Sequence, residues 1–322
     1  MGIFLQVKLF SHMSESTALL RERMENTMCG IVGLFLKQEN LRPRLGDMLT
    51  DMLITMTDRG PDSAGIAIYG DETDGLKVTV QSDDAGSAFD GLQNDLTERL
   101  GTSVPVRVLD THAIITLSRD KRDEGLACLE ERGLRIMGVG DAMEIFKEVG
   151  LPKDVADRFG IRAMQGSHGI GHTRMATESA VTTLGAHPFS TADDQCLVHN
   201  GSLSNHNQMR RRLARDGFVT KTENDTEVGA AYISSRIAKG DTLGEALEGT
   251  LKDLDGFFTF VMGTKNGFGV VRDPIACKPA VMAETDDYVA FASEYRAFAD
   301  LPGIDTARIW EPEPATVYFW ER

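Results

Sequence analysis

Apolar residues in the first part of the chain show two different spacings. Residues 30–35 form a short apolar run that is typical of a buried strand. Over residues 43–57 the apolar positions recur every three or four residues, which predicts an amphipathic helix with Pro43 near its first turn. A turn at residues 58–63 and a second strand at residues 64–69 are expected to follow.

Residues 71–165 have a different character, because short strands and helices alternate there. The expected strands lie at 77–80, 104–117 and 134–139, and the expected helices at 88–100, 121–132 and 142–149. This alternation predicts a small α/β subdomain inserted at residues 71–165.

The second half of the chain mixes hairpins with helices. Lys265-Asn266-Gly267 separates two apolar runs and is a strong hairpin signal. Ser204 is expected to cap a basic helix, and Asn224 or Asp225 to cap the helix after it. The other expected elements are strands at 169–174, 196–199, 257–263, 268–271, 280–283, 288–292 and 317–320, and a helix at 242–254. Hairpins without a parallel βαβ rhythm favour antiparallel sheets covered by helices.

Composition narrows the class of protein. The chain has 322 residues, enough for one large domain or two, and 41% of them are hydrophobic. Its net charge of -15 argues against nucleic acid and anionic membranes as partners. Four cysteines lie far apart with no C-x-x-C pair, which favours reduced thiols in a cytoplasmic protein and no zinc site. No apolar run is long enough to span a membrane.

Residues 1–28 are a poor secretory signal, because polar residues interrupt the apolar start and no basic segment precedes it. They are either a leader that is removed before Cys29 or a non-native extension upstream of a start at Met28. Either route would leave Cys29 as the first residue, with a thiol and a free α-amino group. An α-amine has a pKa of about 8 and acts as a base at neutral pH. The alternative is that Cys29 is a small buried hydrophobic residue beside a strand.

Six short motifs occur in a fixed order. They are CGIVG at 29–33, RGPDSAG at 59–65, GHTRMAT at 171–177, AHPF at 186–189, VHNG at 198–201 and NDTE at 224–227. Together they resemble the class II glutamine amidotransferase domain, which is an N-terminal-nucleophile (Ntn) hydrolase. The resemblance covers most of residues 29–322 outside the insertion. It implies an α+β fold, a four-layer αββα sandwich with two antiparallel sheets.

The resemblance also implies the chemistry of hydrolysing the glutamine amide. Cys29 matches the nucleophile, which forms a thioester while its own α-amine carries the proton. Asn200 and Gly201 match the oxyanion hole, in which a side-chain amide and a backbone N–H meet a charge present only in the transition state. A plain Asn-Gly turn is the other interpretation of the last two residues.

Two further residues match groups that hold the ends of the substrate. Arg174 matches the residue that binds the α-carboxylate, and Asp225 the one that holds the α-ammonium. Thr177 and His187 match other pocket positions. Taken singly, Arg174 could be a surface arginine and Asp225 a helix N-cap. Met175 departs from the family pattern, since several relatives carry an aromatic residue there.

The string DPIACKP at residues 273–279 is similar to free-standing amidotransferase subunits of glutamate-synthase-type enzymes, including N-methylglutamate synthase. This similarity implies that a larger synthase subunit receives the ammonia and carries FMN and an iron–sulfur cluster. No cofactor or metal site is expected in this chain. The alternatives are a non-catalytic regulatory or assembly module, a related amidase acting on another amide, and an amidotransferase serving a different acceptor.

Overall fold

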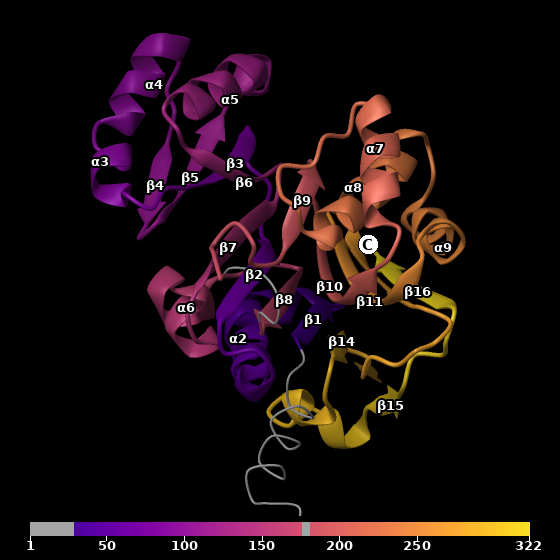
Figure 1. Ribbon diagram of the computed structural model, residues 1–322. Coiled ribbons are helices and arrows are strands. Elements are labelled where there is room, and N and C mark those ends of the chain that lie inside the picture. Colours follow the sequence, from indigo (N-terminus) through magenta and orange to yellow (C-terminus); the bar gives the residue numbers. More distant parts are fainter. Residues whose placement is uncertain (1–28, 176–180) are drawn as a thin grey trace, which may run out of the picture.

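The computed structural model describes residues 29–175 and 181–322. Two antiparallel sheets lie face to face in its main body (Figure 1). The seven-stranded sheet contains, in spatial order, β15 (Arg308–Trp310), β13 (Val281–Glu284), β14 (Tyr288–Ala292), β1 (Gly30–Leu36), β8 (His168–Arg174), β2 (Ser63–Tyr69) and β7 (Met143–Val149). The five-stranded sheet contains β16 (Thr316–Glu321), β12 (Gly267–Arg272), β11 (Gly256–Thr264), β10 (Gln195–Leu203) and β9 (Phe189–Ala192).

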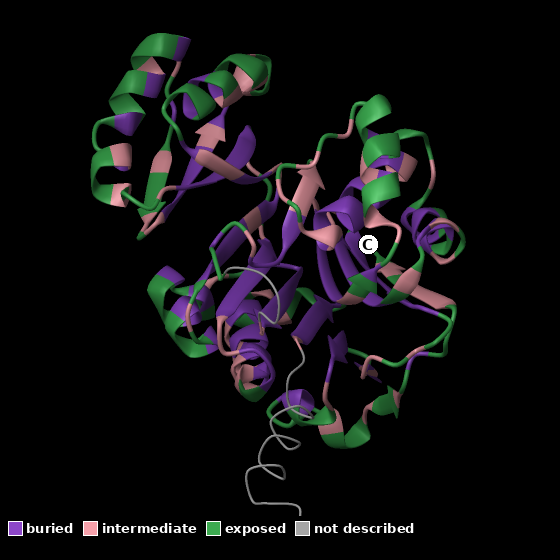
Figure 2. Ribbon diagram, in the orientation of Figure 1, coloured by how far each residue is buried: buried purple, intermediate pink, exposed green. Residues whose placement is uncertain are grey.

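Helices cover the outer face of each sheet. On the seven-stranded sheet lie α2 (Leu45–Thr55) and α6 (Pro152–Phe159), and on the five-stranded sheet lie α7 (His206–Arg215), α8 (Asp225–Ala238) and α9 (Leu243–Asp253). The alternation of side chains along β1 shows the layers. Val32 and Leu34 pack toward α2, whereas Ile31 and Phe35 pack into the apolar layer between the sheets. Both sheets are largely buried (Figure 2), and the predicted αββα sandwich is confirmed.

The insertion has a separate sheet and a hydrophobic core of its own. Its strands lie in the order β4 (Val106–Leu109), β5 (His112–Leu117), β3 (Leu76–Gln81) and β6 (Arg135–Gly140), and its helices are α3 (Ala85–Phe89), α4 (Leu92–Leu100) and α5 (Arg122–Glu131). All of its strand pairs are antiparallel, so the expected α/β subdomain is instead of α+β type.

The helix expected at residues 142–149 is wrong. This segment is strand β7, which pairs with β2 in the main sheet. Ile145 packs between the sheets and Phe146 packs toward the outer helices, a two-residue alternation typical of a strand. The part that leaves the main body is therefore shorter than the expected 71–165. Gly70 N donates to Ala142 O at 3.0 Å, so the two ends of the insertion lie side by side.

Asp194 fixes the return from the insertion. Its carboxylate accepts hydrogen bonds from the backbone N–H groups of Asp141 (2.7 Å), Ala142 (3.0 Å) and Met143 (2.9 Å). Gly140 packs directly against this carboxylate, and a Cβ on Gly140 would lie 2.2 Å from Asp194 Oδ1, so a larger residue would not fit. The turn between β9 and β10 thereby holds the insertion against the body.

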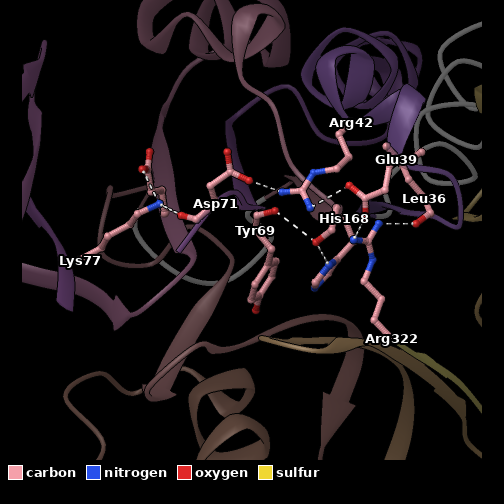
Figure 3. Close-up of polar contacts among 10 residues, drawn as sticks. Leu36, Glu39, Arg42, Tyr69, Asp71, Lys77, His168 and Arg322 are labelled. Atoms are coloured by element: carbon pink, nitrogen blue, oxygen red, sulfur yellow. Dashed lines mark hydrogen bonds and ion pairs between the residues drawn. The ribbon is translucent and has the colours of Figure 1, made fainter. Parts of the chain in front are cut away.

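A second polar network ties the base of the insertion to the end of β1 (Figure 3). Arg42 pairs with Asp71, and Lys77 Nζ donates to Asp71 O at 2.8 Å. Arg322 Nη2 donates to Leu36 O at 2.9 Å. Because Leu36 is the last residue of β1 and Cys29 precedes the first, this network lies roughly 20 Å from Cys29 along the strand.

Other local expectations have mixed outcomes. The strand expected to end at Asn200-Gly201 continues to Leu203, and Asn205 rather than Ser204 precedes α7. The Asn224 cap is confirmed, since its side chain accepts from Thr226 N at 2.9 Å. The hairpin at Lys265–Gly267 is confirmed by the pairing of β11 with β12. Within the described ranges, no helix has the length and apolar character needed to cross a membrane.

Candidate active site

Cys29 lies directly before β1 and is half-buried. Its backbone carbonyl accepts hydrogen bonds from Arg59 Nε at 3.2 Å and Asn200 Nδ2 at 3.1 Å. The next residue, Gly30, packs tightly, since a Cβ there would lie 2.7 Å from Thr173 Oγ1. Two side chains from distant parts of the chain therefore fix the backbone of the predicted nucleophile.

Arg59 is a site residue to which the sequence interpretation gave no role. It is buried, and its Nη1 donates to Glu294 Oε1 at 2.8 Å while its Nε holds Cys29. The adjacent Gly60 lies against the end of β8, where a Cβ would be 2.4 Å from Thr173 C. The motif RGPDSAG marks Arg59 as a charged residue next to two turn-forming residues. Nothing in the motif indicates that the partner of Arg59 is a backbone carbonyl.

Asn200 and Gly201 lie together in β10, in the sheet opposite Cys29. The Asn200 side chain is 3% exposed and reaches Cys29 across the two sheets. Gly201 has a φ of 144°, and a Cβ at this position would lie 2.0 Å from Phe257 O. Both the conformation and the space therefore require glycine. The structure brings the Asn200 amide to the predicted nucleophile, and both residues lie in a strand rather than in a plain turn; their role as an oxyanion hole stays a prediction.

Arg174 ends β8 and is 8% exposed, so it is not a surface arginine. Its Nη1 lies against the backbone of Gly185, where an added Cβ would be 3.2 Å away. Thr177, which was expected to line the same pocket, lies outside the described residues.

The electrostatic surroundings of Cys29 act in opposite directions on its thiol. Burial raises the pKa of the Cys29 thiol, whereas a hydrogen bond from the Met175 backbone and the charges of Arg174, Lys278 and Arg59 lower it. The net shift is upward, so the thiol is protonated at neutral pH and needs a base. Among the described residues, no carboxylate or imidazole hydrogen-bonds to this thiol.

Asp225 begins α8 with its carboxylate near the end of β10. Its Oδ2 accepts from Leu203 N at 2.9 Å, and its Oδ1 lies 3.6 Å from His199 Nδ1. Burial opposes ionisation, but the bonds from His199 and Leu203 outweigh it and lower the pKa of Asp225. Asn224 is the helix N-cap, so Asp225 is left as a charged group that suits an ammonium ligand.

Three buried imidazoles lie beneath these residues. Thr226 Oγ1 lies 2.7 Å from His187 Nε2 and 3.0 Å from His199 Nδ1. His187 stacks on His172 at 3.9 Å, and His172 Nε2 donates to His199 O at 3.1 Å. Burial, reinforced by the neighbouring His172 and His199, holds the pKa of His187 well below its usual value, so this ring is neutral. His187 is thus packed under the site, and its expected contact with substrate stays a prediction.

Comparisons with known proteins show the family to which the chain belongs. A family described as glutamine amidotransferase domain matches residues 172–300. The glutamine amidotransferase-like protein GlxB of Rhizobium meliloti (strain 1021) is 66% identical over 297 residues, covering 91% of this chain and 98% of that protein. This chain belongs to the class II glutamine amidotransferase family.

More distant relatives of this amidotransferase extend the likeness. A putative glutamine amidotransferase of Methanothermobacter thermautotrophicus is 35% identical over 314 residues, covering 91% of this chain and 100% of that protein. The solved structure of glutamine phosphoribosylpyrophosphate amidotransferase from B. subtilis superposes with a TM-score of 0.59 at 20% identity. The match covers 91% of this chain and 47% of that one, and it shows a shared fold. The family resemblance of the six motifs is confirmed.

Proposed function

We propose that this amidotransferase hydrolyses glutamine to glutamate and ammonia, with Cys29 as the N-terminal residue of the active form. The observation that carries the proposal is the double hold on the Cys29 carbonyl by Arg59 and Asn200. A residue whose backbone is fixed by two buried side chains can present its thiol and its α-amine in one defined geometry.

The first chemical step follows from the raised pKa of the Cys29 thiol. The α-amine of Cys29 takes the thiol proton, and the sulfur attacks the side-chain amide carbon of glutamine. The Asn200 amide and the Gly201 N–H stabilise the oxyanion that forms. The C–N bond then breaks as the α-ammonium returns the proton to the leaving nitrogen, which departs as ammonia. Water hydrolyses the remaining thioester and releases glutamate.

The substrate is selected by opposite charges at its two ends. Arg174 pairs with the α-carboxylate through its planar guanidinium, and the ionised Asp225 holds the α-ammonium. Thr177 and His187 are the further residues that we expect to contact glutamine. An amide that lacks the amino-acid end would make neither of these two contacts, so we expect the pocket to discriminate against simple amides.

The ammonia passes to a separate synthase subunit of glutamate-synthase type, which carries the FMN and the iron–sulfur cluster. The loop at residues 273–279 supports a docking role near Cys29. Arg272 Nη2 donates to Ala276 O at 2.7 Å and Lys278 O at 2.8 Å, so the loop is held in one shape. Ile275 is 68% exposed on this loop, and the charge of Lys278 acts on the Cys29 thiol.

The test combines intact mass with turnover on protein purified from its native host. We expect a mass that begins at Cys29, glutamate release from glutamine, and one equivalent of label from a diazoketone analogue of glutamine. Labelling should disappear in Cys29→Ala and persist in Cys277→Ala, which removes an exposed thiol. Activity with residues 1–28 still attached would rule out the amine as base, and a chain with neither labelling nor turnover would be a non-catalytic module.

The partner is tested by adding a flavin-containing synthase subunit to the same assay. We expect a stable complex and faster glutamate release than from the isolated chain, because docking completes the pocket. Full activity of the isolated chain, with no complex on co-purification, would contradict the coupled function and favour a simple glutaminase.

A further inference from the structure

Lys147 is a buried lysine on β7, the edge strand of the seven-stranded sheet. Its ammonium donates to the backbone carbonyls of Ala186 (2.8 Å), Pro188 (3.2 Å) and Leu184 (3.4 Å). Three N–H donors thus meet three carbonyl acceptors on one short segment. The same ammonium lies 4.6 Å from the centre of the Phe189 ring.

The next residue of β7 holds the same segment from the other face of the sheet. Glu148 is buried, and its carboxylate accepts a hydrogen bond from the Thr183 hydroxyl. Because neighbouring residues of a strand point to opposite faces, residues 183–188 wrap around the edge of β7 and are held from both sides.

The held segment forms a wall behind Arg174. Gly185 lies so close that a Cβ would be 3.2 Å from Arg174 Nη1. On the inner face of the sheet, Gly65 pairs with Lys147 on one side and with His172 on the other. The carbonyl of His187 rests on Gly65, where a Cβ would be only 1.9 Å away. Residues 183–188 are therefore packed directly against the inner face of the sheet at this point.

We propose that Lys147 is a positioning residue for glutamine binding, whose ammonium fixes residues 184–188 as the wall that orients Arg174. This inference rests on the proposed function, because it assigns Arg174 to the substrate carboxylate. A buried charge is expensive unless it is fully hydrogen-bonded, and a methionine would fill the same space without it. Burial lowers the pKa of Lys147 to about 8, against the opposing charge of Glu227. The charge is retained at neutral pH, where it can hold three carbonyls.

The first test compares Lys147→Met with Lys77→Met. Both residues are buried lysines that donate to backbone carbonyls, but Lys77 lies at the base of the insertion, away from the wall. We expect Lys147→Met to raise the KM for glutamine roughly tenfold with kcat changed less than about twofold, since a displaced Arg174 weakens the ground state and the transition state alike. Lys77→Met should leave KM unchanged. An unchanged KM in a folded Lys147→Met would overturn the proposal.

A rescue experiment separates positioning from a general loss of structure. Lys147 lines a cavity of about 630 Å³ between the insertion and the five-stranded sheet, with Ile136, Phe189 and Phe218 among its walls. Propylammonium matches the part of the side chain that is missing in Lys147→Ala and can enter through this cavity. We expect propylammonium to lower the KM of Lys147→Ala toward that of the unaltered chain, and propanol to have no effect. Equal effects of the two compounds would overturn the role of the charge.

Gly185→Ala probes the wall without altering Lys147, and it serves if the Lys147 variants do not fold. The added methyl group presses on Arg174, so glutamine should bind more weakly. Binding is measured by calorimetry in a Cys29→Ala background, which needs no turnover. Unaltered glutamine affinity in Gly185→Ala would overturn the wall while leaving the proposed function intact. A Cys29→Ala chain that binds no glutamine would overturn both.

Discussion

Thr226 offers a quantitative test of how the buried imidazoles support the site. Its hydroxyl is the shared partner of His187 Nε2 and His199 Nδ1. One hydroxyl has a single proton, so it donates to one ring nitrogen and accepts from the N–H of the other. Thr226→Val keeps the shape of the side chain and removes both bonds.

The magnitude follows from the burial of all three residues, which are at most 5% exposed. Each imidazole nitrogen that is left without a hydrogen-bond partner lowers the free energy of unfolding by about 1–3 kcal/mol, since no water replaces the hydroxyl. We therefore expect Thr226→Val to lower the free energy of unfolding by about 3 kcal/mol. The matched control is Thr50→Val in α2, since Thr50 is fully buried and its hydroxyl has no partner in the described part of the chain. Removing that hydroxyl should be neutral or slightly stabilising.

Urea unfolding followed by tryptophan fluorescence is the suitable assay. The two tryptophans, Trp310 and Trp320, lie in β15 and β16, so the signal reports on the sandwich and not on the insertion. A loss in Thr226→Val that matched Thr50→Val within about 0.5 kcal/mol, the usual scatter of benign substitutions, would refute the bridging argument.

Three further predictions concern activity, acid stability and the insertion. Asn200→Ala should lower kcat by roughly 10²–10³ with little change in KM, because one oxyanion donor is lost. Steady-state kinetics that showed a changed KM alone would mean that Asn200 only binds substrate. Burial lowers the pKa values of His112, His168 and His172 to about 3. Below a pH of about 6.5 the unfolded chain therefore binds more protons than the folded chain, and the free energy of unfolding should fall by about 1.4 kcal/mol per histidine per pH unit on further acidification. Urea titrations whose midpoints stay constant from neutral pH to a pH of about 5 would contradict this. Replacing residues 71–141 with a short turn should leave a folded chain that binds glutamine, whereas removing 71–165 also deletes β7 and should prevent folding; calorimetry and circular dichroism distinguish the two.

Local signals predicted most of the elements. Asn224 caps its helix and Lys265-Asn266-Gly267 forms its hairpin because these preferences depend on a few neighbouring residues. Strand β7 was missed because its charged residues, Lys147 and Glu148, suggest a solvent-exposed helix face. Lys147 donates to carbonyls at residues 184–188, and Glu148 accepts from the hydroxyls of Thr111 and Thr183. No local pattern shows that charges will be buried against such distant polar groups.

In the candidate site, only the residues that belong to the ordered motifs could be predicted from the sequence. The motifs named Cys29 and Asn200, which the structure brings to 3.1 Å between amide nitrogen and carbonyl oxygen. Arg59 and Lys278 received no role because they act through a backbone carbonyl and through charge at a distance. Such roles depend on the tertiary fold and leave no characteristic residue spacing in the sequence.

The topology explains why a long insertion does not disturb the site. Strands β1 and β8 are antiparallel neighbours with Gly30 opposite Thr173, so the residue before one strand and the last residue of the other must meet. The register places Cys29 beside Arg174 however many residues lie between them. The insertion leaves and re-enters at Gly70 and Ala142, at the opposite end of the sheet. Its return strand β7 then runs back to the site end, where Val149 is opposite Ser63 and Ser63 is opposite Arg174. The base of the insertion is thus remote from Cys29, while the strand that follows it carries Lys147 and Glu148, which hold residues 183–188 next to Arg174.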